Sequence, residues 1–279
     1  MPDLPKRFVD RAKPALRKYQ KIIGSAHTRD VNESDTAVIV SDFLNDVLGY
    51  DKYRDVTTEF AIRSTFCDLA VTLDGHVQYL IEVKSIGTDL KDNHLKQAVD
   101  YGANQGVEWI VLTNAAVWQV HRIRFEQPIQ HERVFEVDLL DANARPLELL
   151  QKLYLISREA ANAGAIDEYW RRKEATSRYV LAQLILSDES ARTLRRRLRR
   201  LFDGISVSEE EIEQVLRTEV LKRDALEGEK AEEAARLVRR AERRRARAAS
   251  DRLVGGTAPL VTPRAAPPPG QHVPHATPA

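Results

Sequence analysis

The chain has 279 residues, of which 43% are hydrophobic, and a net charge of +1, so it can bury one good core and a smaller second unit. Its single cysteine excludes an intramolecular disulfide and a cysteine-based zinc site, as is typical of proteins in a reducing compartment. There is no apolar run of membrane-spanning length and no signal-peptide core after Met1, so we expect a cytoplasmic protein that does not enter a membrane.

The first segment, residues 1–29, is basic and forms the first of four predicted regions. Apolar side chains between Leu16 and Ile23 predict one short helix after Pro14. Asn32 can cap a second helix, whose apolar residues follow helical spacing and which ends near Gly49.

Two strands are predicted at residues 65–73 and 77–84 by strict alternation, and they are joined at Asp74-Gly75, a strong hairpin signal. A two-residue turn would place Asp68 and Glu82 on opposite faces of the sheet. A one-residue bulge, or a three-residue loop, would pair them and match the two apolar faces. Because the buried face sets the register, we predict the longer connection, with both carboxylates on the polar face.

Lys84 follows Glu82 on the same face of this predicted hairpin. Asp68 and Glu82 would supply hard oxygen ligands for Mg²⁺, and Lys84 would stabilise charge developing on a phosphate. The pattern therefore favours metal-dependent hydrolysis of a phosphodiester. The alternative is that the three residues form the solvated face of an ordinary hairpin.

The neighbouring segments complete a mixed sheet. A strand is predicted at residues 56–62, a helix carrying Leu95 and Val99 follows Lys84, and two strands are predicted at 109–112 and 117–123. Helix, three strands, helix and two strands indicate an α/β (α+β) fold with a crossover helix, over residues 30–155.

The C-terminal part is predicted to be a charged helical module at residues 156–252, followed by a disordered Pro-rich tail at 253–279. Ser187 can cap an arginine-rich helix, and Ser208 with Glu211 makes a capping box.

The arginines of this module have three interpretations. They could bind DNA phosphates without sequence preference, form solvated helix faces, or mediate assembly into a homo-oligomer. The residues that we expect to bind nucleic acid are Arg195, Arg196 and Arg199.

Several motifs over residues 30–140 together resemble one known family. They are Glu33, Glu59, Asp68, Glu82-Val83-Lys84, Gln97-x-x-x-Tyr101 and Trp109-Ile110-Val111-Leu112-Thr113-Asn114. In this combination they resemble the N-terminal nuclease domain of type I restriction enzyme R subunits, within the PD-(D/E)xK nuclease superfamily. Cys67 stands where the family pattern has proline.

The resemblance implies a restriction-endonuclease-like mixed central sheet flanked by helices. It implies a Mg²⁺ (or Mn²⁺) ion held by Asp68 and Glu82, and Gln97 on a helix facing the site. Glu33 would add a carboxylate, and Tyr101 would either contact the DNA backbone or pack.

The resemblance also suggests partners. The chain has no Gly-x-x-x-x-Gly-Lys-Ser/Thr phosphate loop, so the helicase motor of the family is absent, and a separate helicase or sequence-recognition subunit is an expected partner. We therefore expect a DNA endonuclease that serves in restriction or phage defence. The alternatives are a catalytically silent nuclease fold that binds nucleic acid or a partner protein, and a helical adaptor for a motor.

Overall fold

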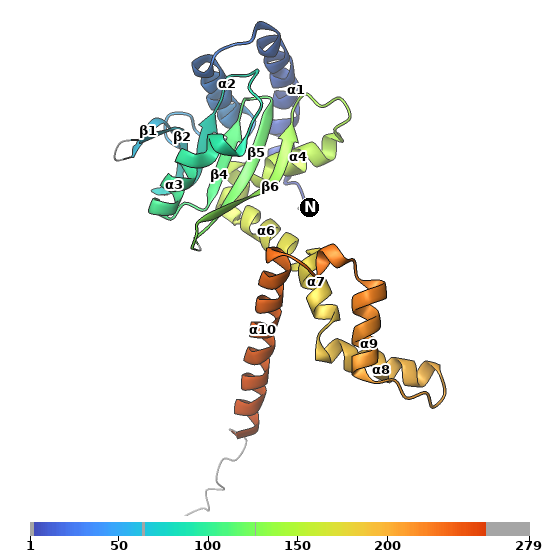
Figure 1. The fold of residues 1–279 in the computed structure, drawn as a ribbon. Coiled ribbons are helices and arrows are strands. Elements are labelled where there is room, and N and C mark those ends of the chain that lie inside the picture. The colour runs from blue at the N-terminus through green and yellow to red at the C-terminus, as the bar shows by residue number, and fades with distance from the viewer. Residues whose placement is uncertain (1–2, 63–64, 126, 255–279) are drawn as a thin grey trace, which may run out of the picture. The chain divides into compact units, whose positions relative to one another are not determined.

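The computed structural model describes residues 3–62, 65–125 and 127–254, with the backbone alone described at 59–62, 65–66 and 249–254. The chain divides into two compact units, Met1–Ala175 and Thr176–Ala279 (Figure 1). Most of the tail predicted at 253–279 lies outside the described residues, and its first two residues end a helix.

The first unit is built on a six-stranded mixed sheet whose strands lie in chain order. β3 and β4 are parallel, and every other neighbouring pair is antiparallel. A parallel pair needs a crossover connection, which α3 provides, so the predicted α/β class is confirmed. The strands are β1 (Val56–Ile62), β2 (Thr65–Leu73), β3 (His76–Val83), β4 (Trp109–Thr113), β5 (Val117–Arg124) and β6 (Gln130–Asp138).

Helices cover both faces of this sheet (Figure 1). The main core lies between one face and α1, α2 and α4, and a smaller core lies between the other face and α3. The helices of the unit are α1 (Lys6–Arg29), α2 (Glu33–Asp46), the short 3-10 helix η1 (Asp92–Leu95), α3 (Lys96–Gln105), α4 (Pro146–Leu155), α5 (Arg158–Ala163) and α6 (Ala165–Ala175). Asn32 caps α2 as predicted, because its side chain accepts a hydrogen bond from the Asp35 amide.

The first helix corrects one expectation. α1 begins at Lys6 and continues through Pro14, rather than forming a short helix after it. Pro14 is exposed, whereas Phe8 and Ile23 from the two halves of α1 are both buried in the main core. Burial of an apolar stripe along the whole helix outweighs the hydrogen bond that proline removes.

The boundaries of the first unit also differ from the expected ones. α1 belongs to the main core, so residues 1–29 are no separate segment, and the unit continues past residue 155 to Ala175. Ile166 and Trp170 of α6 explain the second difference, because both are buried in the main core.

The β2–β3 hairpin has a tight turn. Leu73 pairs with His76, and Asp74 and Gly75 between them both have positive φ (49° and 79°), as a type I′ turn requires. The longer connection that we predicted is therefore wrong.

The other alternative, a bulge, sets the register of this hairpin. Val71 pairs with Tyr79 but Thr72 pairs with Val77, which leaves Gln78 as an extra residue in β3. Beyond the bulge Leu69 pairs with Ile81, so the next position along places Asp68 opposite Glu82.

The second unit is helical in the part that is described. It contains α7 (Arg178–Ile185), α8 (Asp188–Leu201), α9 (Glu209–Val215), the π-helical turn η2 (Leu216–Val220), the 3-10 turn η3 (Arg223–Ala225) and α10 (Glu229–Val254). The Ser187 cap and the capping box of Ser208 and Glu211 are confirmed. Most of its buried side chains are alanine, with Val180, Ile212 and Val238 as the larger ones. No helix among the described residues is long and apolar enough to cross a bilayer.

Candidate functional site

Three residues of the predicted site lie together at the end of the β2–β3 hairpin. Asp68 and Glu82 stand opposite one another across the two strands, and Lys84 directly follows β3. The Lys84 ammonium donates to Glu82 Oε1 at 2.7 Å, and the Val83 amide donates to Asp68 Oδ2 at 2.7 Å. The pleat of β3 explains the first contact, since residues two apart point to the same side.

Glu82 is the most unusual group of the site. It is only 6% exposed, and its Oε2 atom is buried without a hydrogen-bond partner among the described residues. Burial raises the pKa of the Glu82 carboxyl, even though the hydrogen bond from Lys84 opposes the shift; the charge of Asp68 raises the pKa further. Such a face is not the solvated side of an ordinary hairpin, because Leu80 on the same face is fully buried under α3.

Asp68 is half-buried beside Glu82. Burial raises the pKa of the Asp68 carboxyl, the Val83 amide and Lys84 oppose the shift, and the charge of Glu33 adds to it. A buried acceptor without a partner and neighbouring carboxylates that repel one another are both relieved by a bound cation.

Lys84 connects the hairpin to the first turn of α2. Its Nζ lies 3.5 Å from Oε1 of Glu33, the first residue of α2, which is half-exposed. Burial alone would lower the pKa of the Lys84 ammonium, but the hydrogen bond and charge of Glu82, with the charges of Glu33 and Asp68, raise it above its ordinary value. Lys84 therefore stays a cation beside carboxylates that outnumber it.

The backbone around Lys84 is held by the turn between β4 and β5. The Lys84 amide donates to the Thr113 carbonyl at 2.8 Å, which extends the parallel β3–β4 pairing by one residue. The buried Asn114 side chain donates to the Thr88 carbonyl at 3.0 Å and fixes the loop after Lys84. The position of the ammonium is thus determined by strand pairing as well as by its ion pairs.

Two predicted residues of α3 do not join this cluster. Gln97 is exposed and forms no hydrogen bond with Asp68, Glu82 or Lys84 in the described structure. Tyr101 is 7% exposed and lies in the smaller core, which favours packing over contact with DNA.

The remaining predicted residues are elsewhere in the chain. The side chain of Glu59, on β1, lies outside those that the structure describes. Arg195, Arg196 and Arg199 all lie on α8 in the second unit.

The donor set at the hairpin fits a hard divalent cation. Mg²⁺ typically takes one or two carboxylates and fills its other positions with water and phosphate oxygens. Asp68 and Glu82 provide the carboxylates, and Glu82 Oε2 is an acceptor that has no other partner in the described part of the chain. Among the described residues no three histidine, cysteine or acidic residues gather closely enough to hold a metal by themselves.

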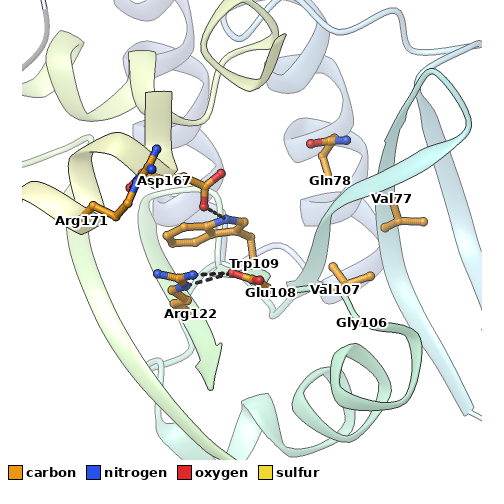
Figure 2. Close-up of a pocket in the computed structure, with 9 residues that line it drawn as sticks. All are labelled: Val77, Gln78, Gly106, Val107, Glu108, Trp109, Arg122, Asp167 and Arg171. Atoms are coloured by element: carbon orange, nitrogen blue, oxygen red, sulfur yellow. Dashed lines mark hydrogen bonds and ion pairs between the residues drawn. The ribbon is translucent and has the colours of Figure 1, made fainter. Parts of the chain in front are cut away.

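A separate cavity of about 420 Å³ opens at the start of β3 and β4 (Figure 2). Its charged side chains and the Trp109 indole each contact another residue of the lining. Arg122 binds Glu108 and stacks on the Trp109 ring, and the Trp109 indole donates to Asp167 of α6 at 3.2 Å. None of the predicted site residues lines this cavity, and its contacts fasten α6 to the sheet.

A buried histidine on β5, His121, which packs against the half-buried His131 of β6, was not foreseen from the sequence. His121 is 1% exposed, neither of its ring nitrogens has a partner in the described structure, and its ring centre lies 5.7 Å from that of His131. Burial first, and then the charge of His131, lowers the pKa of His121 to about 4. Alternation along β5 could have placed His121 on the α3 face, but β6 was not predicted.

No protein-family model matches the chain, no curated protein matches it, and no solved structure matches it.

Proposed function

We propose that the first unit is a metal-dependent nuclease that hydrolyses phosphodiester bonds in DNA. The observation that carries this proposal is Glu82, a buried carboxylate opposite Asp68, with one oxygen bound to Lys84 and the other without a partner among the residues that the structure describes. Burying a carboxylate in this state costs free energy, which a bound cation would recover.

Asp68 and Glu82 would hold Mg²⁺ or Mn²⁺, which when bound polarises the scissile phosphate and acidifies a water molecule. The Val83 amide keeps Asp68 oriented through its 2.7 Å hydrogen bond. Lys84 would turn from Glu82 toward the phosphate and stabilise the charge that develops there. Glu33, whose Oε1 lies 3.5 Å from Lys84 Nζ, would help to keep the ammonium in place.

Plasmid and single-stranded DNA cleavage with Mg²⁺ or Mn²⁺ tests this proposal. The wild type is compared with Glu82→Gln and Lys84→Met, and Glu108→Gln serves as a control on the same sheet. We expect metal-dependent cleavage by the wild type and the control, and a loss of about 100-fold or more in both site variants, the size typical for removing a charge-stabilising group.

Each outcome has a definite meaning. Cleavage that survives in both site variants would refute this site. If the wild type does not cut, Mg²⁺ titration followed by thermal denaturation decides whether the carboxylates bind metal at all, because a ligand that binds only the folded state raises its stability.

A second candidate is a silent nuclease fold that binds nucleic acid or a partner protein. The observation that favours it is the ion pair of Lys84 with Glu82 at 2.7 Å, which partly neutralises the carboxylate without a metal. Under this alternative the wild type would neither cut DNA nor gain stability from Mg²⁺. A role in restriction or phage defence, with a helicase or recognition subunit as partner, belongs to the first proposal and would appear as co-purification with such a subunit.

A further inference from the structure

The arginines of α8 surround a cavity of about 630 Å³ in the second unit. Its lining consists of Glu189, Arg192, Arg195, Arg196, Arg199 and Glu209. Within this set Arg192 lies three and four residues before Arg195 and Arg196, and Arg199 lies four and three residues after them, so the four arginines share one face of α8. The adjacent side of the helix anchors it, because Ala191 is buried and Leu194 and Leu198 are half-buried.

The two acidic residues of the lining already have basic partners. Glu209 of α9 lies 3.2 Å from Arg195 of α8, and Glu189 lies 3.4 Å from Arg245 of α10. Arg195 is therefore the arginine of this face whose charge is largely satisfied inside the protein.

The other three arginines keep their charge available. Among the described residues Arg192 donates only to the Asp188 carbonyl of its own helix, and Arg196 donates to the Thr193 hydroxyl. Arg199 and these two are exposed, and none forms an ion pair with a carboxylate in the described part of the chain. Like charges three and four residues apart repel one another, and a polyanion would relieve that repulsion.

The spacing of these arginines suits a phosphate backbone. From Arg192 to Arg199 the helix rises roughly 10 Å, about the rise of three nucleotides along one strand of a duplex. A guanidinium group binds phosphate oxygens through two parallel hydrogen bonds, a geometry that lysine cannot reproduce.

We propose that this face of α8 binds backbone phosphates of nucleic acid without sequence preference, through Arg192, Arg196 and Arg199. The inference rests on the proposed function for its choice of DNA as ligand, and it assigns the second unit the task of holding DNA. Arg195, which the sequence predicted to bind DNA, is not among the proposed contacts, because it forms an ion pair with Glu209.

Binding of a short labelled duplex, measured by fluorescence anisotropy on the full chain in EDTA, tests the inference without cleavage. The double variant Arg196→Gln/Arg199→Gln is compared with Arg217→Gln/Arg223→Gln. The second pair removes the same charge from the same unit, but those arginines are ion-paired to Glu213 and Glu227.

The salt dependence gives the sharpest readout. Between about 50 and 200 mM salt, the plot of log affinity against log salt should be less steep for Arg196→Gln/Arg199→Gln than for the wild type, by about 1.8, because two phosphate contacts are lost. Affinity should fall roughly tenfold for Arg196→Gln/Arg199→Gln, whereas the control should keep the wild-type slope. Equal weakening of both variants would show a general charge effect and overturn the inference.

Two further measurements distinguish this inference from binding of an acidic protein and from the proposed nuclease activity. A polyglutamate peptide that displaces the duplex at equal charge concentration would identify an acidic protein as the occupant, and the inference would fail. Cleavage with Mg²⁺ is measured on the same samples: intact binding without cleavage would contradict the nuclease alone, and cleavage with unchanged binding in the α8 variant would contradict the arginine face alone. Circular dichroism checks that both variants keep their helices.

Discussion

His121 makes the stability of the first unit sensitive to acid. Its ring is buried on the face of the sheet that α3 covers, with His131 and Arg133 as basic neighbours and Asp92 as the acidic one. Because neither ring nitrogen has a partner in the described structure, the imidazole is favoured in its neutral form. Replacing His121 by leucine removes both buried nitrogens and conserves most of the volume.

The size of the effect follows from the two pKa values. In the unfolded chain the pKa is 6.5, and in the fold it is lowered to about 4. Between these values the unfolded state binds more protons, so stability falls as the pH falls. The complete loss is about 3 kcal/mol below pH 4, and about 2 kcal/mol of it has occurred at about pH 5.

Urea denaturation at about pH 7.5 and about pH 5 measures this difference. Trp109, Trp118 and Trp170 are the only tryptophans in the sequence and all belong to the first unit, so their fluorescence reports on that unit alone. His121→Leu should match or exceed the wild-type stability at about pH 7.5, by up to about 2 kcal/mol, since an unsatisfied buried polar group is removed.

The comparison between variants isolates the histidine. Burial raises the pKa values of Asp68 and Glu82, so protonation of these groups favours the fold at low pH and opposes the effect of His121 in the wild type. Wild type and His121→Leu both contain Asp68 and Glu82, so this opposing effect is the same in both proteins. His76→Gln, at an exposed position on β3, provides the control. If His121→Leu loses as much stability on acidification as the wild type does, the reasoning is refuted.

Three other predictions concern the same unit. Lys84→Met should destabilise it by about 3 kcal/mol at neutral pH, because Glu82 loses its buried partner, and adding Glu82→Gln should restore most of the loss; equal losses in the single and double variants would contradict this. Gly102→Ala should cost roughly 1–3 kcal/mol, since its new Cβ would lie 2.4 and 2.7 Å from its nearest neighbours, whereas Gly24→Ala meets nothing within 4 Å and should not destabilise. Residues 1–175 expressed alone should show the tryptophan denaturation curve of the full chain, and a shifted midpoint would reveal a stabilising contribution from the second unit.

Alternation and turn chemistry were sufficient to predict the centre of the fold. The strands that carry Asp68 and Glu82, the position of the turn at Asp74-Gly75 and the cap at Asn32 were predicted correctly, because each depends on residues close together in the sequence. The length of the turn was predicted wrongly, because the bulge at Gln78, and not a longer connection, sets the register. The approach of Asp68, Glu82 and Lys84 follows from the same local rules once the register is known.

Features that depend on distant contacts were missed. β6 escaped prediction because Val134 and Phe135 are adjacent and both buried in the main core, which breaks alternation at an irregularity in its pairing with β5. The ion pair of Lys84 with Glu33 depends on how α2 docks, which no local pattern specifies.

Gln97 is a different case, because the sequence did hold a signal. The buried residues of α3 include Ala98, Val99, Tyr101 and Gly102, and they define the side of the helix that faces the sheet. Gln97 lies outside this stripe, so a helical projection would have predicted its exposure.

The extra residue Gln78 determines where the β2–β3 hairpin can change in length without disturbing the site. At the exposed hairpin tip, Asp74 and Gly75 lie beyond the bulge, so a peptide tag inserted there would leave the pairing near Asp68 in place. Deletion of Gln78 would instead shift the rest of β3 by one position and turn Glu82 into the main core. The site therefore depends on the number of residues in β3 as much as on the Glu82 carboxylate. Deletion of the neutral Gln78 should disrupt the site as much as removal of Glu82.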